Sequence, residues 1–291
     1  MSTIVFPPVL FIGCVAVLGL WVGAWVARCV YALPRSLEAA WQLQLVQAQA
    51  ESAGDIQATL EGSPHVCADL APAPHLTAPV PCAACGSVAR GWRTWPGISA
   101  VAAPLACAAC GKRGGTVTRL VEWCCALVFG LCAWRYGYSV ALVFALVFCA
   151  LLVTLAFIDA QTTLLPDVIT LPLLWLGLLV NSGVGWAPLS HAVWGAALGY
   201  GGLWLVYHAF RLATGREGMG YGDFKLLAAL GAWLGVHMLP LVLLGASLAG
   251  VVVGLFLRFT GRAHAGQALP FGPYLSAAGI IALIWFVEFP G

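Results

Sequence analysis

Charged side chains are scarce in this chain. Asp, Glu, Lys and Arg make up only 8% of the 291 residues, whereas hydrophobic residues make up 62%. A soluble globular domain carries roughly 25% charged residues, so this composition excludes an ordinary soluble protein. The net charge of +2 is too small and too dispersed to attract nucleic acid. We therefore expect an integral membrane protein that has the lipid bilayer as a partner and no nucleic-acid partner.

Several familiar catalytic patterns are missing as well. The chain has no GxSxG and no HExxH motif, and no cytoplasmic cysteine outside two CxxC pairs has an evident histidine partner. These absences argue against a serine enzyme of the α/β-hydrolase type and against a HExxH metalloprotease. No basic residue precedes Arg28, so the positive region of a cleaved signal peptide is lacking and we expect none.

Long apolar runs dominate the sequence instead. A helix needs roughly 17 to 25 residues to cross the hydrocarbon core of a bilayer. Runs of this length predict an all-α polytopic membrane protein with about eight transmembrane helices. Single turn-forming residues, Gly137, Pro188 and Pro240, separate several of them. The predicted spans are residues 6–27, 120–136, 138–158, 168–187, 189–210, 224–239, 240–257 and 270–288.

The basic residues predict how the spans are oriented, because short cytoplasmic loops collect Lys and Arg. If residue 28 lies inside, twelve of the thirteen basic residues fall on the cytoplasmic side, and Arg135 is the exception. The N-terminus then lies outside. The same orientation of the spans places Asp159 and Asp223 at the cytoplasmic ends of their spans.

One segment, residues 28–119, differs in composition from the rest and is predicted to be a cytoplasmic insert. It divides the chain into a first transmembrane helix (1–27), the insert, and a core of about seven transmembrane helices (120–291). Apolar residues recur at helical spacing near its start. They indicate an amphipathic helix that lies either on the membrane or against the insert itself: Leu37, Trp41, Leu45 and Ala48.

Two CxxC pairs lie in the insert. They are Cys82 with Cys85 and Cys107 with Cys110, separated by 21 residues and each followed directly by a glycine. This spacing is typical of a tetrathiolate zinc ribbon, and a cytoplasmic position would keep the thiols reduced. Four thiolates complete a tetrahedron, so the predicted zinc ion is structural. Redox-active or unliganded cysteines are the alternatives.

Two acidic residues sit where the apolar runs end. Asp159 follows a run of twenty apolar or small residues, and Asp223 follows the glycine-rich segment 218–222. An acid at a membrane boundary is costly, which favours a functional role. The simpler interpretations are a helix cap for Asp223 and a polar end marker for Asp159. If the two carboxyl groups meet, they share a proton and can hydrolyse a peptide bond as general base and general acid.

Four motifs, in order along the chain, resemble the bacterial type IV prepilin peptidases, which are aspartic membrane proteases with a GxGD motif. The matching pieces are the double CxxC insert, FID (157–159) with LPD (165–167), GMGYGDFKL (218–226) and PFGP (270–273). The resemblance implies that Asp159 and Asp223 are the catalytic dyad and that Cys82, Cys85, Cys107 and Cys110 bind zinc.

The same resemblance implies substrates, a cofactor and a location. Enzymes of this family cleave the basic leader from type IV prepilins and from pseudopilins of type II secretion. Many also methylate the new N-terminus with S-adenosylmethionine. The protein is then expected in the bacterial cytoplasmic (inner) membrane with its active site facing the cytoplasm. Acids such as Asp167 or Glu217 are expected either to attract the leader or to be ordinary solvated loop residues.

The chain departs from the family pattern near the insert. Where the family has GSFxN and then RLP, this sequence has GAWVA (23–27) and ALP (32–34). Between the CxxC pairs, the family's NIP and RGxC become TWP (94–96) and PLAC (104–107). These losses lie in the region that the resemblance associates with methyl transfer, so they weaken the case for methylation more than the case for proteolysis.

Two other classes of function use the same features. A proton or ion transporter would use the two aspartates as a relay, but it would need acids or broken helices near the bilayer midplane. A non-catalytic scaffold for a secretion machine would depend on the cysteines and not on the aspartates.

Overall fold

The described part of the chain is helical throughout. The structure is a computed structural model, and it describes residues 8–53, 85, 87, 109–111, 116–183, 185–215, 219–261 and 269–287. No β-strand occurs within these ranges. The predicted all-α class is therefore confirmed for the described residues, and most of the predicted insert lies outside them.

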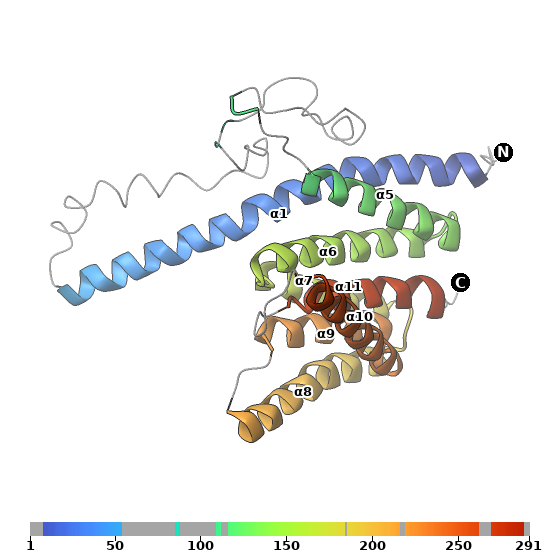
Figure 1. Ribbon diagram of the computed structural model, residues 1–291. Coiled ribbons are helices and arrows are strands. Elements are labelled where there is room, and N and C mark those ends of the chain that lie inside the picture. Colours follow the sequence, from blue (N-terminus) through green and yellow to red (C-terminus); the bar gives the residue numbers. More distant parts are fainter. Residues whose placement is uncertain are drawn as a thin grey trace.

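The first helix, α1 (Pro8–Ala53), is much longer than the sequence predicted. The prediction ended the helix at residue 27, yet it continues through Pro34 and extends past the edge of the bundle (Figure 1). Residues 28–53 contain no glycine and are rich in Ala, Leu and Gln, which favour helix. The predicted amphipathic segment is thus helical but continuous with α1, and Trp41 is exposed within it.

The helices α5 (Thr116–Tyr136) and α6 (Val140–Thr162) follow as an antiparallel pair beside α1 (Figure 1). Gly137 has a φ of +55°, which glycine adopts without strain, and it provides the predicted turn between them. Ser139 then caps α6 by accepting a hydrogen bond from the Leu142 N–H. Close packing of α1 on α5 requires glycine, since a Cβ at Gly23 would lie 2.7 Å from the Cα of Glu122.

The next three helices are α7 (Asp167–Ser182), α8 (Leu189–Thr214) and α9 (Tyr221–Leu234). Pro188 is the N-cap of α8. It therefore separates α7 from α8, as the sequence predicted for the spans on either side of it. The backbones of α8 and α9 touch at Gly195 and Gly231, where a Cβ on either residue would collide with the other. The short helix α9 is therefore held tightly against α8 and α7.

The chain then continues through η2 (Val236–Met238), α10 (Leu239–Phe259) and α11 (Gly272–Ile281), and its last described element is a π-helical turn, η3 (Ala282–Phe286). Pro240 stands in the first turn of α10, a position that proline favours because its missing N–H is not needed there. Helix α11 packs against α6, α10 and α9. It therefore brings the C-terminal part of the chain against the helices that carry both aspartates.

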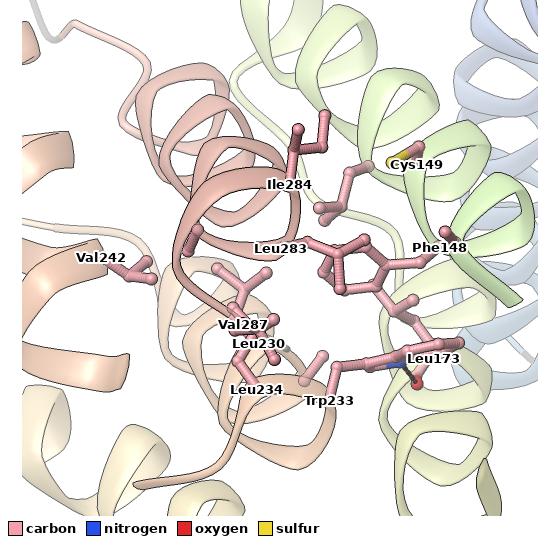
Figure 2. Packing of buried hydrophobic residues seen from close by; sticks show 14 of the residues in the cluster. Phe148, Cys149, Leu173, Leu230, Trp233, Leu234, Val242, Leu283, Ile284 and Val287 are labelled. Carbon is pink, nitrogen blue, oxygen red and sulfur yellow. Dashed lines mark hydrogen bonds between the residues drawn. The ribbon is translucent and has the colours of Figure 1, made fainter. Parts of the chain in front are cut away.

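A large apolar core joins these helices. Figure 2 shows Phe148 of α6, Leu173 of α7, Trp233 of α9 and Leu283 of η3 facing one another. The Trp233 indole N–H donates a 2.7 Å hydrogen bond to the Leu173 carbonyl oxygen, so this large side chain is buried with its polar atom satisfied. The core fixes the relative positions of α6, α7, α9 and α11.

Arg135, the exception to the predicted orientation pattern, has a structural role at the end of η3. Its Nε atom donates to the Ile284 carbonyl oxygen at 3.0 Å, and the Tyr136 hydroxyl donates to the Leu283 carbonyl oxygen at 2.8 Å. Carbonyl groups at the end of a helix lack partners within it. Arg135 and Tyr136 supply those partners from α5.

Four described helical segments are long and apolar enough to cross a membrane: Pro8–Ala48, Thr116–Tyr136, Val140–Thr162 and Val236–Phe259. Two shorter apolar segments, Asp167–Ser182 and Gly272–Phe286, accompany them. An integral membrane protein is therefore supported. The count of eight transmembrane helices stays a prediction.

Candidate active site

Asp159 lies in the last turn of α6. The helix ends because Thr163 adopts a left-handed conformation, with φ of 54°, and its N–H donates to the Asp159 carbonyl oxygen at 2.8 Å. The short segment 163–166 then leads into α7, and Pro166 is the N-cap of that helix. The proline had indicated such a break between two helices. Although Asp159 is near a helix end, it is only 4% exposed. Its carboxyl group therefore points into the bundle and not into solvent.

A backbone group from the far end of the chain holds that carboxyl group. The N–H of Gly272, at the start of α11, donates a 2.9 Å hydrogen bond to Oδ2 of Asp159. A Cβ at position 272 would lie 2.7 Å from the same oxygen, so the contact needs glycine. The PFGP motif thus has a physical purpose: it places an N–H group of a helix N-terminus against an acid.

Asp223 occupies the first turn of α9, as the sequence predicted, and Gly220 is the N-cap. It is 7% exposed. Helix α9 is not one of the four segments long enough to cross a membrane. Burial first, and then repulsion from the Asp159 carboxylate, raises the pKa of Asp223 to about 7, while a backbone hydrogen bond from Gly220 opposes the rise.

The two predicted aspartates therefore come together from different helices. Each is buried, and the electrostatic effect of Asp159 on Asp223 shows that their carboxyl groups lie within interaction range. Two such groups do not both ionise easily, so the pair keeps a proton at a higher pH than an isolated aspartate does. A pair that holds one proton contains both a base and an acid.

The second glycine of the GxGD motif allows the loop before α7 to reach the site. A Cβ at Gly222 would lie 2.7 Å from the Cβ of Leu165. Leu165 belongs to the LPD segment that follows Asp159. Any larger residue at position 222 would therefore push apart the two segments that carry the aspartates.

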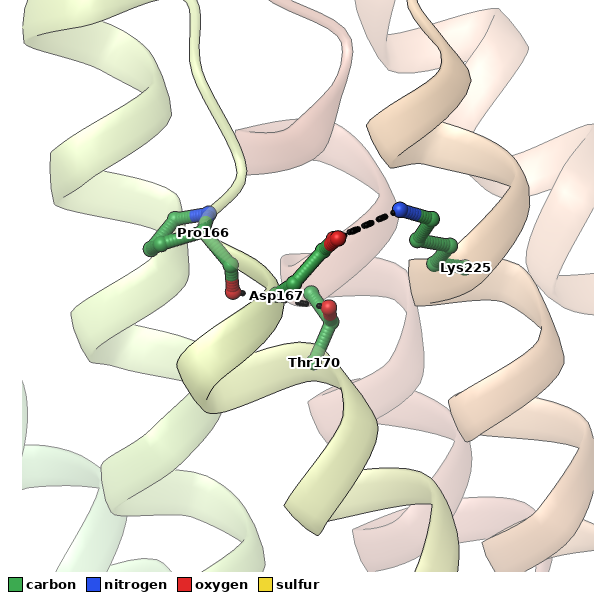
Figure 3. A network of polar contacts seen from close by, with 4 residues as sticks. All are labelled: Pro166, Asp167, Thr170 and Lys225. Carbon is green, nitrogen blue, oxygen red and sulfur yellow. Dashed lines mark hydrogen bonds and ion pairs between the residues drawn. The ribbon is translucent and has the colours of Figure 1, made fainter. Parts of the chain in front are cut away.

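An ion pair connects the same two segments at the surface. Lys225 Nζ lies 2.7 Å from both carboxylate oxygens of Asp167 (Figure 3). The two side chains are 29% and 52% exposed. Asp167 is therefore not a free loop acid: Lys225 neutralises it in this structure. Glu217, the other acid expected either to attract the leader or to be a solvated loop residue, lies outside the described residues.

The predicted zinc ligands are only partly described. Cys85 and Cys110 are exposed, whereas Cys82 and Cys107 lie outside the described residues. Gly111, directly after the second pair, has a φ of +69°, which fits the tight turn that a CxxC metal knuckle requires. No group of three or more potential metal ligands occurs among the described residues. The zinc site stays a prediction.

Comparison with known protein families matches two parts of the chain. Residues 146–255, which include both aspartates, match the model of the type IV leader peptidase family. Residues 17–136, which include both CxxC pairs, match the model of the bacterial peptidase A24 N-terminal domain. The chain belongs to the type IV leader peptidase family. The resemblance seen in the sequence motifs is confirmed, and with it the enzyme class of a prepilin peptidase.

Curated relatives within this family cover nearly the whole chain. A prepilin leader peptidase/N-methyltransferase of Pseudomonas putida is 44% identical over 96% of this chain and 92% of its own. A protein of the same name from Pseudomonas aeruginosa is 40% identical over 96% and 91%. Another from Neisseria gonorrhoeae is 37% identical over 91% and 87%. No solved structure gives a significant match.

The structure adds one contact that sequence reasoning missed. The PFGP motif was recognised as part of the family pattern, but nothing in the residue types indicated that Gly272 contacts Asp159. The donor is a backbone N–H, which every residue except proline has, so it leaves no trace in the sequence.

Proposed function

We propose that Asp159 and Asp223 form the catalytic dyad of a prepilin peptidase, which cleaves the leader from type IV prepilins and type II secretion pseudopilins. The observation that carries the proposal is the burial of two carboxyl groups, from α6 and α9, close enough for one to raise the pKa of the other. The family membership of the chain supports the same reaction.

In the proposed mechanism the pair starts with one ionised and one protonated carboxyl group. The ionised group takes a proton from a water molecule while the water oxygen attacks the scissile carbonyl carbon. The other group donates its proton to the carbonyl oxygen or to the departing amine, and the C–N bond breaks. No covalent intermediate forms. The Gly272 N–H holds the Asp159 carboxyl group in one orientation throughout.

The active site is proposed to face the cytoplasm from the inner membrane. The support is the distribution of basic residues, which places the ends of α6 and α9 carrying the aspartates on the Lys- and Arg-rich side. A prepilin whose leader remains cytoplasmic would present its scissile bond at this depth.

Methylation of the new N-terminus and a structural zinc ion complete the proposal. The relatives' names include N-methyltransferase, which implies S-adenosylmethionine as the methyl donor. The binding residues for this donor are unassigned. Zinc would be held by Cys82, Cys85, Cys107 and Cys110 and would stabilise the fold of the insert without taking part in either reaction.

Mass spectrometry of a co-expressed prepilin tests the proposal in one measurement. The mature N-terminus should begin directly after the leader, and a mass 14 Da larger than that of the unmodified product indicates methylation. An uncleaved prepilin in cells that contain the intact enzyme would refute the peptidase function. A cleaved but unmethylated product would refute only the transferase part.

A further inference from the structure

Ser276 is a buried polar residue that the mechanism above does not use. It lies in the middle of α11 and is 0% exposed, and its hydroxyl group has no hydrogen-bond partner among the described residues. A buried hydroxyl group without a partner is costly and uncommon, so its retention calls for an explanation.

Threonine hydroxyl groups of α6 and α7 instead donate hydrogen bonds to carbonyl oxygens four residues earlier in the chain. Thr154 and Thr162 of α6 donate to the carbonyl oxygens four residues earlier, at 2.7 and 2.9 Å. Thr170 of α7 does the same at 3.4 Å. This is the usual solution for Ser and Thr inside helices. The hydroxyl group of Ser276 makes no such hydrogen bond to its own helix.

Ser276 lies about one helical turn after Gly272, the residue of α11 that contacts the dyad. Buried residues of α11 form one face, with Gly272, Ser276 and Gly279 spaced along it. At one end of this face, Gly272 contacts Asp159 of α6. At the other end, a Cβ on Gly279 would meet Leu230 of α9 and Leu152 of α6. Along this buried face, Ser276 comes between Gly272 and Gly279.

The spacing suits one bridging water molecule. Ser276 makes no direct hydrogen bond to the Asp159 carboxyl group. Four residues of α-helix separate it from Gly272 by a rise of about 6 Å. Two hydrogen bonds of about 2.8 Å each through one water molecule span roughly the same 6 Å. A serine side chain also leans toward the N-terminus of its helix, which is the end that contacts Asp159.

We propose that Ser276 is a positioning residue, whose hydroxyl group binds a buried water molecule that donates a hydrogen bond to the carboxyl pair. The proposal rests on the dyad function. This hydrogen bond stabilises the ionised carboxylate and restrains its orientation. Removing the hydroxyl group therefore makes the pair harder to ionise and leaves it less well oriented.

The pH profile of cleavage separates this role from a packing role. Few other titratable groups face this region. On α11 and the elements packed against it, the described groups are Cys149 and Asp159 on α6, Tyr221, Asp223 and Lys225 on α9, Arg258 on α10 and Tyr274 on α11 itself. Of these, only the two aspartates change charge in the weakly acidic range. A shift of the acidic limb therefore reports on the dyad.

The test compares Ser276→Ala and Ser276→Cys with the unmodified enzyme in the same lipid. Both variants lose the strong hydroxyl donor, but cysteine keeps the volume. We expect both to cleave a synthetic prepilin about tenfold more slowly and to shift the acidic limb to higher pH. Thr154→Val is the matched control, because that hydroxyl group is satisfied on α6; it should change neither quantity.

Three outcomes would overturn the proposal. The first is an unchanged cleavage rate and pH profile in Ser276→Ala. The second is a slower rate in Ser276→Ala together with a normal rate in Ser276→Cys. The third is a shift of the acidic limb in Thr154→Val as large as that in Ser276→Ala. Asp159→Asn is measured alongside. If it abolishes cleavage while Ser276→Ala has no effect, only the role of Ser276 fails. If Asp159→Asn still cleaves, the dyad itself is wrong.

Discussion

The backbone N–H of Gly272 and the Oδ2 atom of Asp159, 113 positions apart along the chain, are joined by a 2.9 Å hydrogen bond. This contact fixes the start of α11 against the end of α6. It also gives the buried carboxyl group a donor that cannot titrate, so the acid keeps its orientation in either protonation state.

Replacing Gly272 with alanine should damage catalysis more than folding. The added Cβ would lie 2.7 Å from Asp159 Oδ2 and would displace the carboxyl group. Misplacing a catalytic group by about 1 Å can cost on the order of a hundredfold in rate. We expect cleavage to fall at least tenfold while the protein accumulates in the membrane. Gly201→Ala on α8, where nothing lies within 4 Å, is the control and should be nearly silent.

Cleavage should decline as the pH rises above neutrality. Burial and repulsion from Asp159 raise the pKa of Asp223 to about 7, so this group is protonated below that pH and ionised above it. The mechanism needs one proton on the pair, and loss of that proton removes the general acid. We expect the rate to fall about tenfold per pH unit well above pH 7. A rate that stays constant from pH 6 to pH 9 would contradict this assignment.

The ion pair between Lys225 and Asp167 should contribute little to stability. Both side chains are partly exposed, at 29% and 52%, and such pairs contribute about 0.2–1 kcal/mol. A double-mutant cycle with Lys225→Met and Asp167→Asn measures the coupling from thermal unfolding in detergent. Raising the salt concentration should weaken it. A coupling above about 2 kcal/mol would show that the pair is more deeply buried than in this structure.

Arg135 should matter for stability and not for the reaction. Its guanidinium group donates to the Ile284 carbonyl oxygen at 3.0 Å and the Val287 carbonyl oxygen at 3.5 Å. In Arg135→Met these carbonyl groups lose their partner, and we expect the melting temperature to fall by several degrees. Arg258→Met, at the exposed end of α10, is the matched control. An equal fall in both variants would argue against a capping role.

Zinc content tests the ligand assignment. Purified protein should contain about one zinc ion per chain, and the double variant Cys82→Ser/Cys107→Ser should contain almost none. Replacing Cys132, a buried cysteine of α5 outside the CxxC pairs, with alanine should leave the metal content unchanged. Undiminished zinc in the double variant would refute the proposed ligands.

The sequence predicted the parts of this structure that depend on local chemistry. The turn at Gly137 and the start of α8 after Pro188 follow from backbone preferences. Asp159 and Asp223 were recognisable because acids at the ends of apolar runs are unusual. The length of α1 was mispredicted because a change to polar composition at residue 28 suggested a domain boundary, although composition changes do not interrupt a helix.

Contacts between distant segments could not be predicted in the same way. The role of Gly272 depends on a backbone donor, and that of Gly222 depends on how closely Leu165 approaches it. Ser276 looks like any small residue in an apolar helix until its burial and missing partner are known. These features arise from packing, which a residue-by-residue pattern does not contain.

Single substitution of each aspartate by asparagine tests the central claim most directly. Asparagine keeps the size of the side chain but cannot exchange the proton that the dyad must move. Purified Asp159→Asn and Asp223→Asn enzymes, reconstituted in lipid with a synthetic prepilin, should each cleave at least about a thousandfold more slowly than the unmodified enzyme. Cleavage by either variant within about tenfold of the unmodified rate would contradict the account.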